Sequence, residues 1–155
     1  MNKRSGSNAS AIELLKTDHR KVESLLDAFK KAEDDDERGE LAEQICHELT
    51  VHAEIEENIF YATAREQFPE RDIEILDEAL IEHAVVKGLI SEIRNSTPGE
   101  PLFDAKVKVL GELVRHHIKE EEGEMMPKVQ RCDIDLVTLG TQLMNAKAEL
   151  TAEEV

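Results

Sequence analysis

The chain reads His-Ala-Glu-Ile-Glu at residues 52–56 and His-Ile-Lys-Glu-Glu at residues 117–121, and these two stretches organise the rest of the sequence. Each stretch places a histidine four residues before a glutamate. In an α-helix this spacing puts the imidazole and the carboxylate on one face, one turn apart. Two such pairs facing each other could hold a pair of metal ions, so we interpret the remaining sequence as the scaffold that brings them together.

The composition favours a single helical domain. The chain has 155 residues, of which 40% are hydrophobic and 3% aromatic, which suffices for one core filled mainly by aliphatic side chains. Charged residues make up 35%, with only four prolines and seven glycines. Such a balance is typical of long, solvated helices.

The charge and the cysteines limit the partners and the compartment. A formal net charge of −16 repels phosphate backbones and anionic lipid surfaces, so we expect neither a nucleic acid nor a membrane as partner. No apolar run is long enough to span a bilayer, and no secretory signal is recognisable. Cys46 and Cys132 form no Cys-x-x-Cys motif, so we expect reduced thiols in a cytoplasmic protein.

Hydrophobic periodicity predicts four long helices. Apolar residues recur at alternating spacings of three and four in segments separated by short polar loops, the clearest loop being residues 95–101. The first helix begins at the capping box formed by Ser10 and Glu13. We therefore predict an all-α fold, an up-down-up-down four-helix bundle over residues 10–131. Residues 1–9 are predicted to be flexible and residues 132–155 to form a short additional C-terminal helix and a tail.

Four histidines fall on the apolar stripes at similar depth in the predicted bundle. Across each predicted turn, consecutive stripe histidines differ in depth by at most two residues, or roughly 3 Å. The halves also repeat each other, since each contains a lone histidine followed after 33 or 34 residues by His-x-x-x-Glu. We therefore predict that six side chains converge on a metal site: His19, His52, Glu56, His83, His117 and Glu121.

Histidines and glutamates on an apolar stripe can also have an ordinary structural role. A single histidine on an apolar stripe is more often a hydrogen-bonded core residue than a ligand. A buried carboxylate is harder to explain without a partner or a metal, and Glu56 and Glu121 both lie on stripes. His116 is assigned to the rim of the site. Tyr61, about 140° from Glu56 around an ideal α-helix, is predicted to pack at the edge of the core.

The predicted ligands suit iron. Mixed imidazole and carboxylate ligands favour iron, with manganese, zinc and copper as competitors. Four histidines and two bridging glutamates would leave about two positions open on a pair of oxo- or hydroxo-bridged octahedral ions, enough for small ligands. Ferritin-type centres use Glu-x-x-His pairs, and no histidine of this chain follows a glutamate at that spacing.

These motifs resemble those of the hemerythrin-like family in its HHE cation-binding form. The matching segments are Asp18-His19, residues 52–61, Glu82-His83 and residues 117–127, and the resemblance spans about residues 11–130. It implies a four-helix bundle with a non-haem di-iron centre that binds oxygen or related small molecules.

The chain departs from the oxygen-carrying hemerythrins at two positions. Those proteins have a fifth histidine where this chain has Lys87, and their last motif is His-x-x-x-x-Asp. The resemblance therefore implies a more open centre, able to react with peroxide or nitric oxide, to which Glu57 or Glu120 could contribute a substitute ligand.

Three functional hypotheses follow. The first is a di-iron protein that binds or detoxifies dioxygen, peroxide or nitric oxide, and the sequence does not decide whether it is an enzyme. The second is an iron-dependent sensor or iron store without turnover. The third is a structural bundle with no functional metal.

Overall fold

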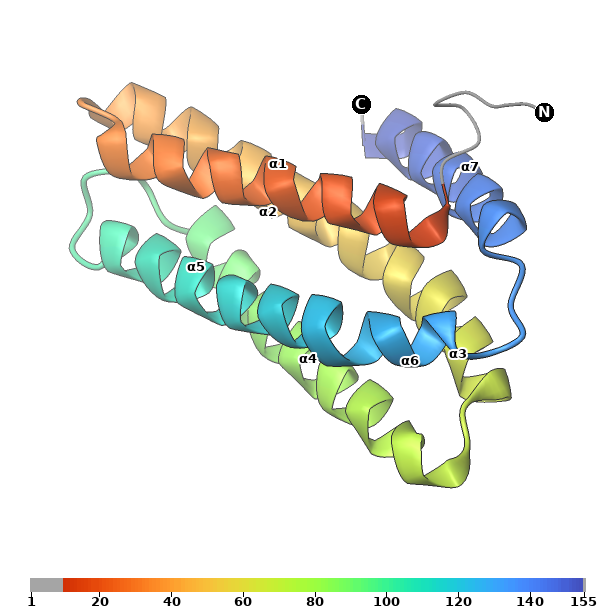
Figure 1. The fold of residues 1–155 in the computed structure, drawn as a ribbon. Helices are drawn as coiled ribbons and strands as arrows, with labels where there is room; N and C mark the ends of the chain where they lie inside the picture. Colours follow the sequence, from red (N-terminus) through yellow and green to blue (C-terminus); the bar gives the residue numbers. More distant parts are fainter. Residues whose placement is uncertain (1–9, 155) are drawn as a thin grey trace.

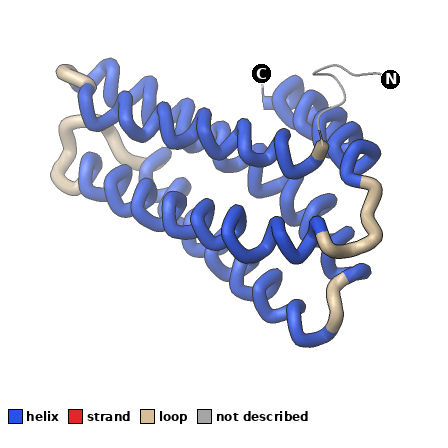
Figure 2. The backbone as a smooth tube through the Cα atoms, viewed as in Figure 1, coloured by secondary structure: helices blue, strands red, loops and turns tan. Residues whose placement is uncertain are grey.

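A computed structural model describes the backbone of residues 10–154, and the predicted flexible segment 1–9 lies outside the described residues. Within this range the chain is entirely helical, with no strand (Figure 2). Four antiparallel helical segments form the bundle and a fifth packs at one end (Figure 1), so the prediction of an all-α bundle with an additional C-terminal helix is confirmed.

The bundle helices follow the predicted order. Helix α1 spans Ala11–Lys31, and the second segment runs without a break through α2 (Asp35–Ile55), the π-helical η2 (Glu56–Phe60) and α3 (Tyr61–Gln67). A short 3₁₀ turn, η3 (Glu70–Asp72), leads into α4 (Ile73–Arg94). The fourth segment again contains a π-helical turn and joins three pieces: α5 (Phe103–Glu120), η4 (Glu121–Met125) and α6 (Met126–Gln130).

Side-chain caps fix where two of these helices begin. The predicted capping box is present, because the Glu13 amide donates to Ser10 Oγ at 3.3 Å and the Ser10 amide donates to Glu13 Oε1 at 3.2 Å. Asp34 caps α2 by accepting from the Glu37 amide at 2.8 Å. These caps set the register that carries the stripes of α1 and α2 into the core.

The apolar core is divided in two along the bundle axis. One cluster contains Leu15, Ile55, Leu76 and Met125, and the other contains Val22, Leu49, Ile90 and Val114. On each bundle helix the predicted site residues fall between members of these two clusters. The polar centre is therefore enclosed by hydrophobic layers above and below, which excludes water and strengthens its electrostatic interactions.

Two π-helical turns are the main local departure from the prediction. In both halves the turn begins at the motif glutamate, and the backbone N–H five residues later donates to that glutamate's carbonyl. The fourth segment continues through Pro127 to Gln130, close to residue 131, where the bundle was predicted to end. Proline lacks an amide donor, and here it lies in the first turn of α6, directly after the π-helical turn, where it is tolerated.

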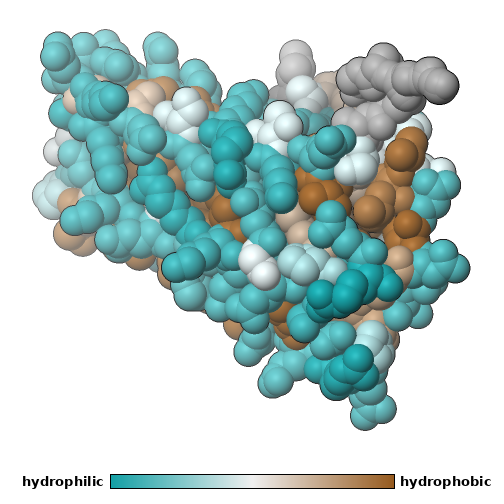
Figure 3. Space-filling view, viewed as in Figure 1, coloured by the Kyte–Doolittle hydropathy of each residue, from teal (hydrophilic) through white to brown (hydrophobic). Residues whose placement is uncertain are grey.

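The C-terminal helix is longer than expected. A short helix followed by a tail was predicted for residues 132–155, whereas α7 spans Leu136–Glu154. It packs against α1 and α2 through the buried Leu139 and Leu143 (Figure 1). Hydrophilic side chains cover most of the face shown in Figure 3, and apolar ones gather over α7. None of the helices in residues 10–154 has the length and apolarity needed to cross a membrane.

Candidate metal centre

The structure brings the six predicted side chains together in the middle of the bundle. They come from α1, α2 with η2, α4, and α5 with η4, and none exposes more than 9% of its surface. They form two groups that share Glu56, and in each group the potential ligand atoms lie within 4.8 Å of one another. Whether these residues bind metal stays a prediction, but their convergence follows from the stripe positions.

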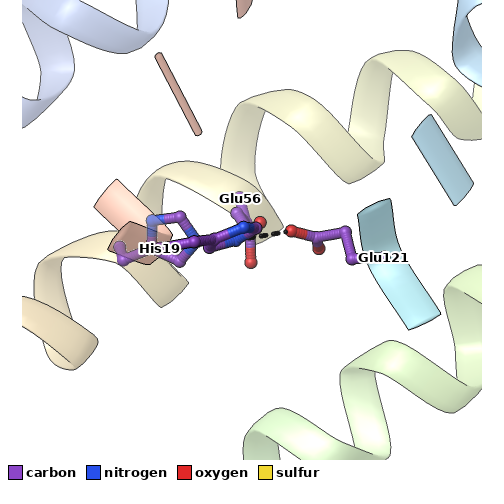
Figure 4. A group of neighbouring side chains, drawn as sticks. His19, Glu56 and Glu121 are labelled. Atoms are coloured by element: carbon purple, nitrogen blue, oxygen red, sulfur yellow. Dashed lines mark ion pairs between the residues drawn. The ribbon is translucent and has the colours of Figure 1, made fainter. Parts of the chain in front are cut away.

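The first group contains His19, His52, Glu56 and Glu121. His19 Nε2 lies 3.0 Å from Glu121 Oε1, and His52 Nε2 lies 3.0 Å from Glu56 Oε2. Figure 4 shows His19, Glu56 and Glu121 pointing toward one another from three helical segments.

These four atoms provide a test of whether a metal fits. Each is buried and, despite the short separations, none forms a hydrogen bond of acceptable geometry. Buried polar atoms without hydrogen bonds are rare and cost about 1–3 kcal/mol each. A cation coordinated by two imidazole nitrogens and two carboxylate oxygens would satisfy all four at once, so the residues present fit a metal.

The second group contains Glu56, His83 and His117. His83 Nε2 lies 3.1 Å from Glu56 Oε1, and His117 Nε2 lies 3.5 Å from Glu121 Oε2. Each glutamate therefore directs one oxygen to the first group and the other oxygen to the second. This is the arrangement that a carboxylate bridging two cations requires.

Tyr61 belongs to the centre, and the prediction that it packs at the core edge is wrong. Its hydroxyl donates to Glu121 Oε2 at 2.5 Å and lies 3.1 Å from Glu56 Oε1, 3.3 Å from His83 Nε2 and 3.2 Å from His117 Nε2. The π-helical turn η2 holds more residues per turn than an α-helix, so the fifth residue after Glu56 returns to its face.

Four carboxylates hold the imidazoles from behind. In every case Nδ1 contacts a carboxylate oxygen and Nε2 faces the centre, with the pairs His19–Glu122 at 2.6 Å, His52–Asp18 at 2.9 Å, His83–Glu57 at 2.7 Å and His117–Glu82 at 2.6 Å. Such partners fix the tautomer and orientation of metal-binding histidines and raise their basicity. The four pairs follow the twofold pattern of the sequence. In each half, one carboxylate comes from the residue before the lone histidine and the other from the residue after the motif glutamate.

The alternative ligands considered from the sequence lie elsewhere. Glu57 contacts Nδ1 of His83 and Lys87 Nζ at 2.9 Å, so it supports a histidine from outside. The His116 side chain is 64% exposed and pairs with Glu120 at 3.4 Å. Neither Glu57, Glu120 nor His116 belongs to the two buried groups.

Two of the predicted ligand histidines bind protons strongly. Burial opposes protonation of His52, but attraction to Glu56, Asp18 and Glu121 outweighs it and raises the pKa of His52 to about 10. Burial also opposes protonation of His117, and Glu121 and Glu56 raise its pKa to about 11. The metal-free centre therefore carries imidazolium protons at neutral pH, and a metal must displace them.

The tyrosine stays protonated. Burial, together with the Glu121 and Glu56 carboxylates, raises the pKa of Tyr61 well above its usual value. Its hydroxyl is therefore a fixed hydrogen-bond donor at neutral pH, aimed at the carboxylate that would bridge two ions.

A small apolar chamber adjoins the four imidazoles on the side away from the glutamates. Its volume is about 40 Å³, which exceeds the space needed for one water molecule. Apolar side chains from all four bundle segments make up most of its wall: Val22, Leu49, Val86, Ile90, Val114 and Ile118. A weakly polar molecule of two or three atoms fits such a space.

Helix α7 also reaches the centre. Lys147 Nζ donates to Asp18 Oδ1 at 2.5 Å, and the other oxygen of Asp18 accepts from His52 Nδ1. Asp18 is 5% exposed. Among the described contacts of its carboxylate, Lys147 is the only positive charge besides the His52 imidazolium.

Comparisons with known proteins identify the family of the chain and agree with its fold. The family model described as "Hemerythrin HHE cation binding domain" matches residues 10–129. A solved structure of a hemerythrin HHE cation binding domain-containing protein from Mycobacterium kansasii superposes with a TM-score of 0.80 at 23% identity, covering 94% of this chain and 89% of that chain.

Two curated relatives share part of their length with this chain. A DNA nickase from Nostoc sp. is 29% identical over 118 residues, which cover 76% of this chain and 33% of the relative. An uncharacterized hemerythrin-like protein from Schizosaccharomyces pombe is 27% identical over 114 residues, 74% of this chain and 56% of the relative. The chain thus spans a third and just over half of their lengths. With its buried histidines and glutamates arranged to suit a metal, the chain belongs to the hemerythrin HHE cation-binding domain family.

Proposed function

We propose that the buried centre holds two iron ions bridged by Glu56 and Glu121. The observation that carries this proposal is the division of each carboxylate between the two groups, one oxygen within 3.0 Å of a first-group imidazole and the other directed to the second group. His19 and His52 would hold one ion, and His83 and His117 the other. Mixed nitrogen and oxygen ligands suit iron, and manganese or zinc would also be accommodated.

We further propose that the centre binds or detoxifies dioxygen, peroxide or nitric oxide. The apolar chamber beside the imidazoles admits molecules of that size and disfavours charged ones. Iron, when bound, supplies one-electron redox chemistry. The chain itself supplies enclosure between two apolar layers, orientation of the imidazoles by carboxylates, and a proton held on the Tyr61 hydroxyl.

The proposed partners are small molecules in the cytoplasm. The name of the Nostoc relative refers to action on DNA, but this chain matches only 33% of that protein. A net charge of −16 opposes contact with phosphate backbones, so we propose that DNA is not a partner.

The experiment is iron loading followed by peroxide decay. The proposal expects about two irons per chain, the near-ultraviolet and visible absorption of a bridged di-iron(III) centre, and peroxide decay that Glu56→Gln abolishes. Glu54→Gln, two residues earlier on the same segment and outside the buried groups, is the matched control and should keep wild-type decay. Protein without stoichiometric iron, or equal decay in the two variants, would contradict the proposal.

A second candidate is an iron-dependent sensor or store without turnover. The contact between Lys147 of α7 and Asp18 favours this candidate, because Asp18 also contacts His52, a predicted ligand. A sensor would change the hydrogen-exchange protection of α7 when the centre binds iron or nitric oxide, and would leave peroxide intact.

A further inference from the structure

A second group of potential ligands lies outside the buried centre, between α4 and α5. Glu82, His116 and Glu120 place their ligand atoms within 4.8 Å of one another. His116 is mostly exposed, whereas Glu82 and Glu120 are partly buried. The group combines an imidazole with two carboxylates, ligands that a divalent transition metal accepts.

Two members of this outer group, Glu82 and Glu120, line both an open cleft and a small inner cavity, and His116 lies beside them. The cleft has a volume of about 410 Å³, and carboxylates make up four of its five lining residues: Asp77, Glu78, Glu82 and Glu120, with Ile81. The inner cavity has a volume of about 10 Å³, and Glu82 and Glu120 line it together with His117 and Glu121. Its size is close to that of one water molecule.

The inner end of this passage meets the buried centre. Glu121 is 1% exposed and lines this inner cavity together with His117. Glu82 touches both ends, since it belongs to the outer group and its Oε1 lies 2.6 Å from His117 Nδ1. Glu82 and Glu120 therefore line both the open cleft and the inner cavity, and His117 and Glu121 of the centre line the inner cavity with them.

The opposite approach to the centre is unsuitable for a cation. The chamber beside the imidazoles is lined mostly by aliphatic side chains. A divalent cation entering there would lose part of its hydration against these apolar side chains before it reached the imidazoles, which is costly. The carboxylates of the cleft and of the inner cavity offer oxygen ligands to a cation and raise the local concentration of cations.

We propose that Fe(II) enters the buried centre between α4 and α5, and that Glu82, His116 and Glu120 form a transfer site that binds the ion first. The ion exchanges water for these ligands and then for those of the centre, without change of oxidation state. Small uncharged reactants use the apolar chamber on the other side. This inference rests on the proposed metal centre, and it adds the path by which metal arrives.

The test measures how fast metal-free protein takes up Fe(II) under nitrogen. The protein is mixed with Fe(II), the chelator ferrozine is added at successive times, and the iron protected from the chelator is counted. His116→Ala, Glu120→Gln and the double variant remove transfer-site ligands, while Glu82 is kept because it holds His117. Glu112→Gln is the matched control, because it removes one exposed carboxylate from the same helix outside the cleft.

The proposal expects the transfer-site variants to reach the same final iron content as the wild type, but about tenfold or more slowly. The Glu112→Gln variant should load at the wild-type rate. Equilibrium dialysis of the loaded wild type should also show an additional, weaker Fe(II) equivalent that His116→Ala lacks.

Three results would overturn the proposal. Wild-type loading rates in the double variant would exclude the route while leaving the buried centre intact. A lower final iron content in Glu120→Gln would make Glu120 a ligand of the centre itself. A wild type that protects no iron would refute the proposed centre and the route together.

Discussion

Removing the hydroxyl of Tyr61 should destabilise the metal-free protein more than the iron-loaded protein. The hydroxyl is the donor closest to Glu121 Oε2, at 2.5 Å, and both side chains are at most 2% exposed. In Tyr61→Phe that oxygen keeps only His117 Nε2, at 3.5 Å. Hydrogen bonds to charged groups contribute about 1.5–3 kcal/mol, so we expect a loss of that size without metal.

Iron should reduce this loss. In the iron-loaded protein an ion would bind Glu121 Oε2, the oxygen that accepts a hydrogen bond from the Tyr61 hydroxyl. The loss of stability caused by Tyr61→Phe should therefore fall to about 0.5–1.5 kcal/mol. The difference of about 1–1.5 kcal/mol corresponds to roughly 5- to 13-fold tighter metal binding by the variant.

Differential scanning calorimetry measures both effects. For a chain of this size about 1 kcal/mol shifts Tm by 2–4 °C, so the metal-free variant should melt roughly 3–12 °C below the wild type. Met126→Leu is the matched control, since Met126 occupies the equivalent place after η4 and such swaps cost less than about 1.5 kcal/mol. A variant destabilised equally with and without iron would refute the reasoning, and so would one with wild-type stability.

Three further predictions concern the surroundings of the centre. Lys147→Met should lower stability by about 1–3 kcal/mol because it leaves the buried Asp18 without its lysine, and Lys147→Arg should restore it; equal melting temperatures for both variants would contradict this. The pKa values of about 10 for His52 and about 11 for His117 predict that iron binding at pH 7 releases about two protons, measurable in weakly buffered solution, and that metal affinity falls as pH falls. Burial raises the pKa of Cys46 to about 11, so its thiol stays protonated at pH 8 and iodoacetamide should label only one of the two cysteines of the folded protein, as counted by mass spectrometry.

Helical spacing made the convergence of the six side chains predictable. A histidine followed four residues later by a glutamate places both side chains on one face of a helix. The numbers of residues between the predicted turns and His19, His52, His83 and His117 are nearly equal, which places these histidines at similar depth. The apolar stripes similarly indicated the four bundle segments and the loop at residues 95–101. These inferences depend only on the regular α-helix, which most of the described chain adopts.

The remaining features depend on departures from that regularity or on contacts between helices. Tyr61 was misplaced because an α-helix was assumed through Glu56, where a π-helical turn shifts every later residue. The carboxylates behind the histidines, such as Glu57 and Glu122, lie off the stripes, and only the packed structure shows that they reach another helix. Lys147 was not predicted because nothing in the periodicity of α7 specifies which residue faces Asp18.

The central claim is that two metal ions lie between Glu56 and Glu121. Anomalous diffraction at the iron absorption edge from crystals of iron-loaded protein tests it most directly. We predict two peaks bridged by these carboxylates, one beside His19 and His52 and the other beside His83 and His117. A single peak in the centre, iron only at the Glu82, His116 and Glu120 group, or no peak at all would contradict the claim.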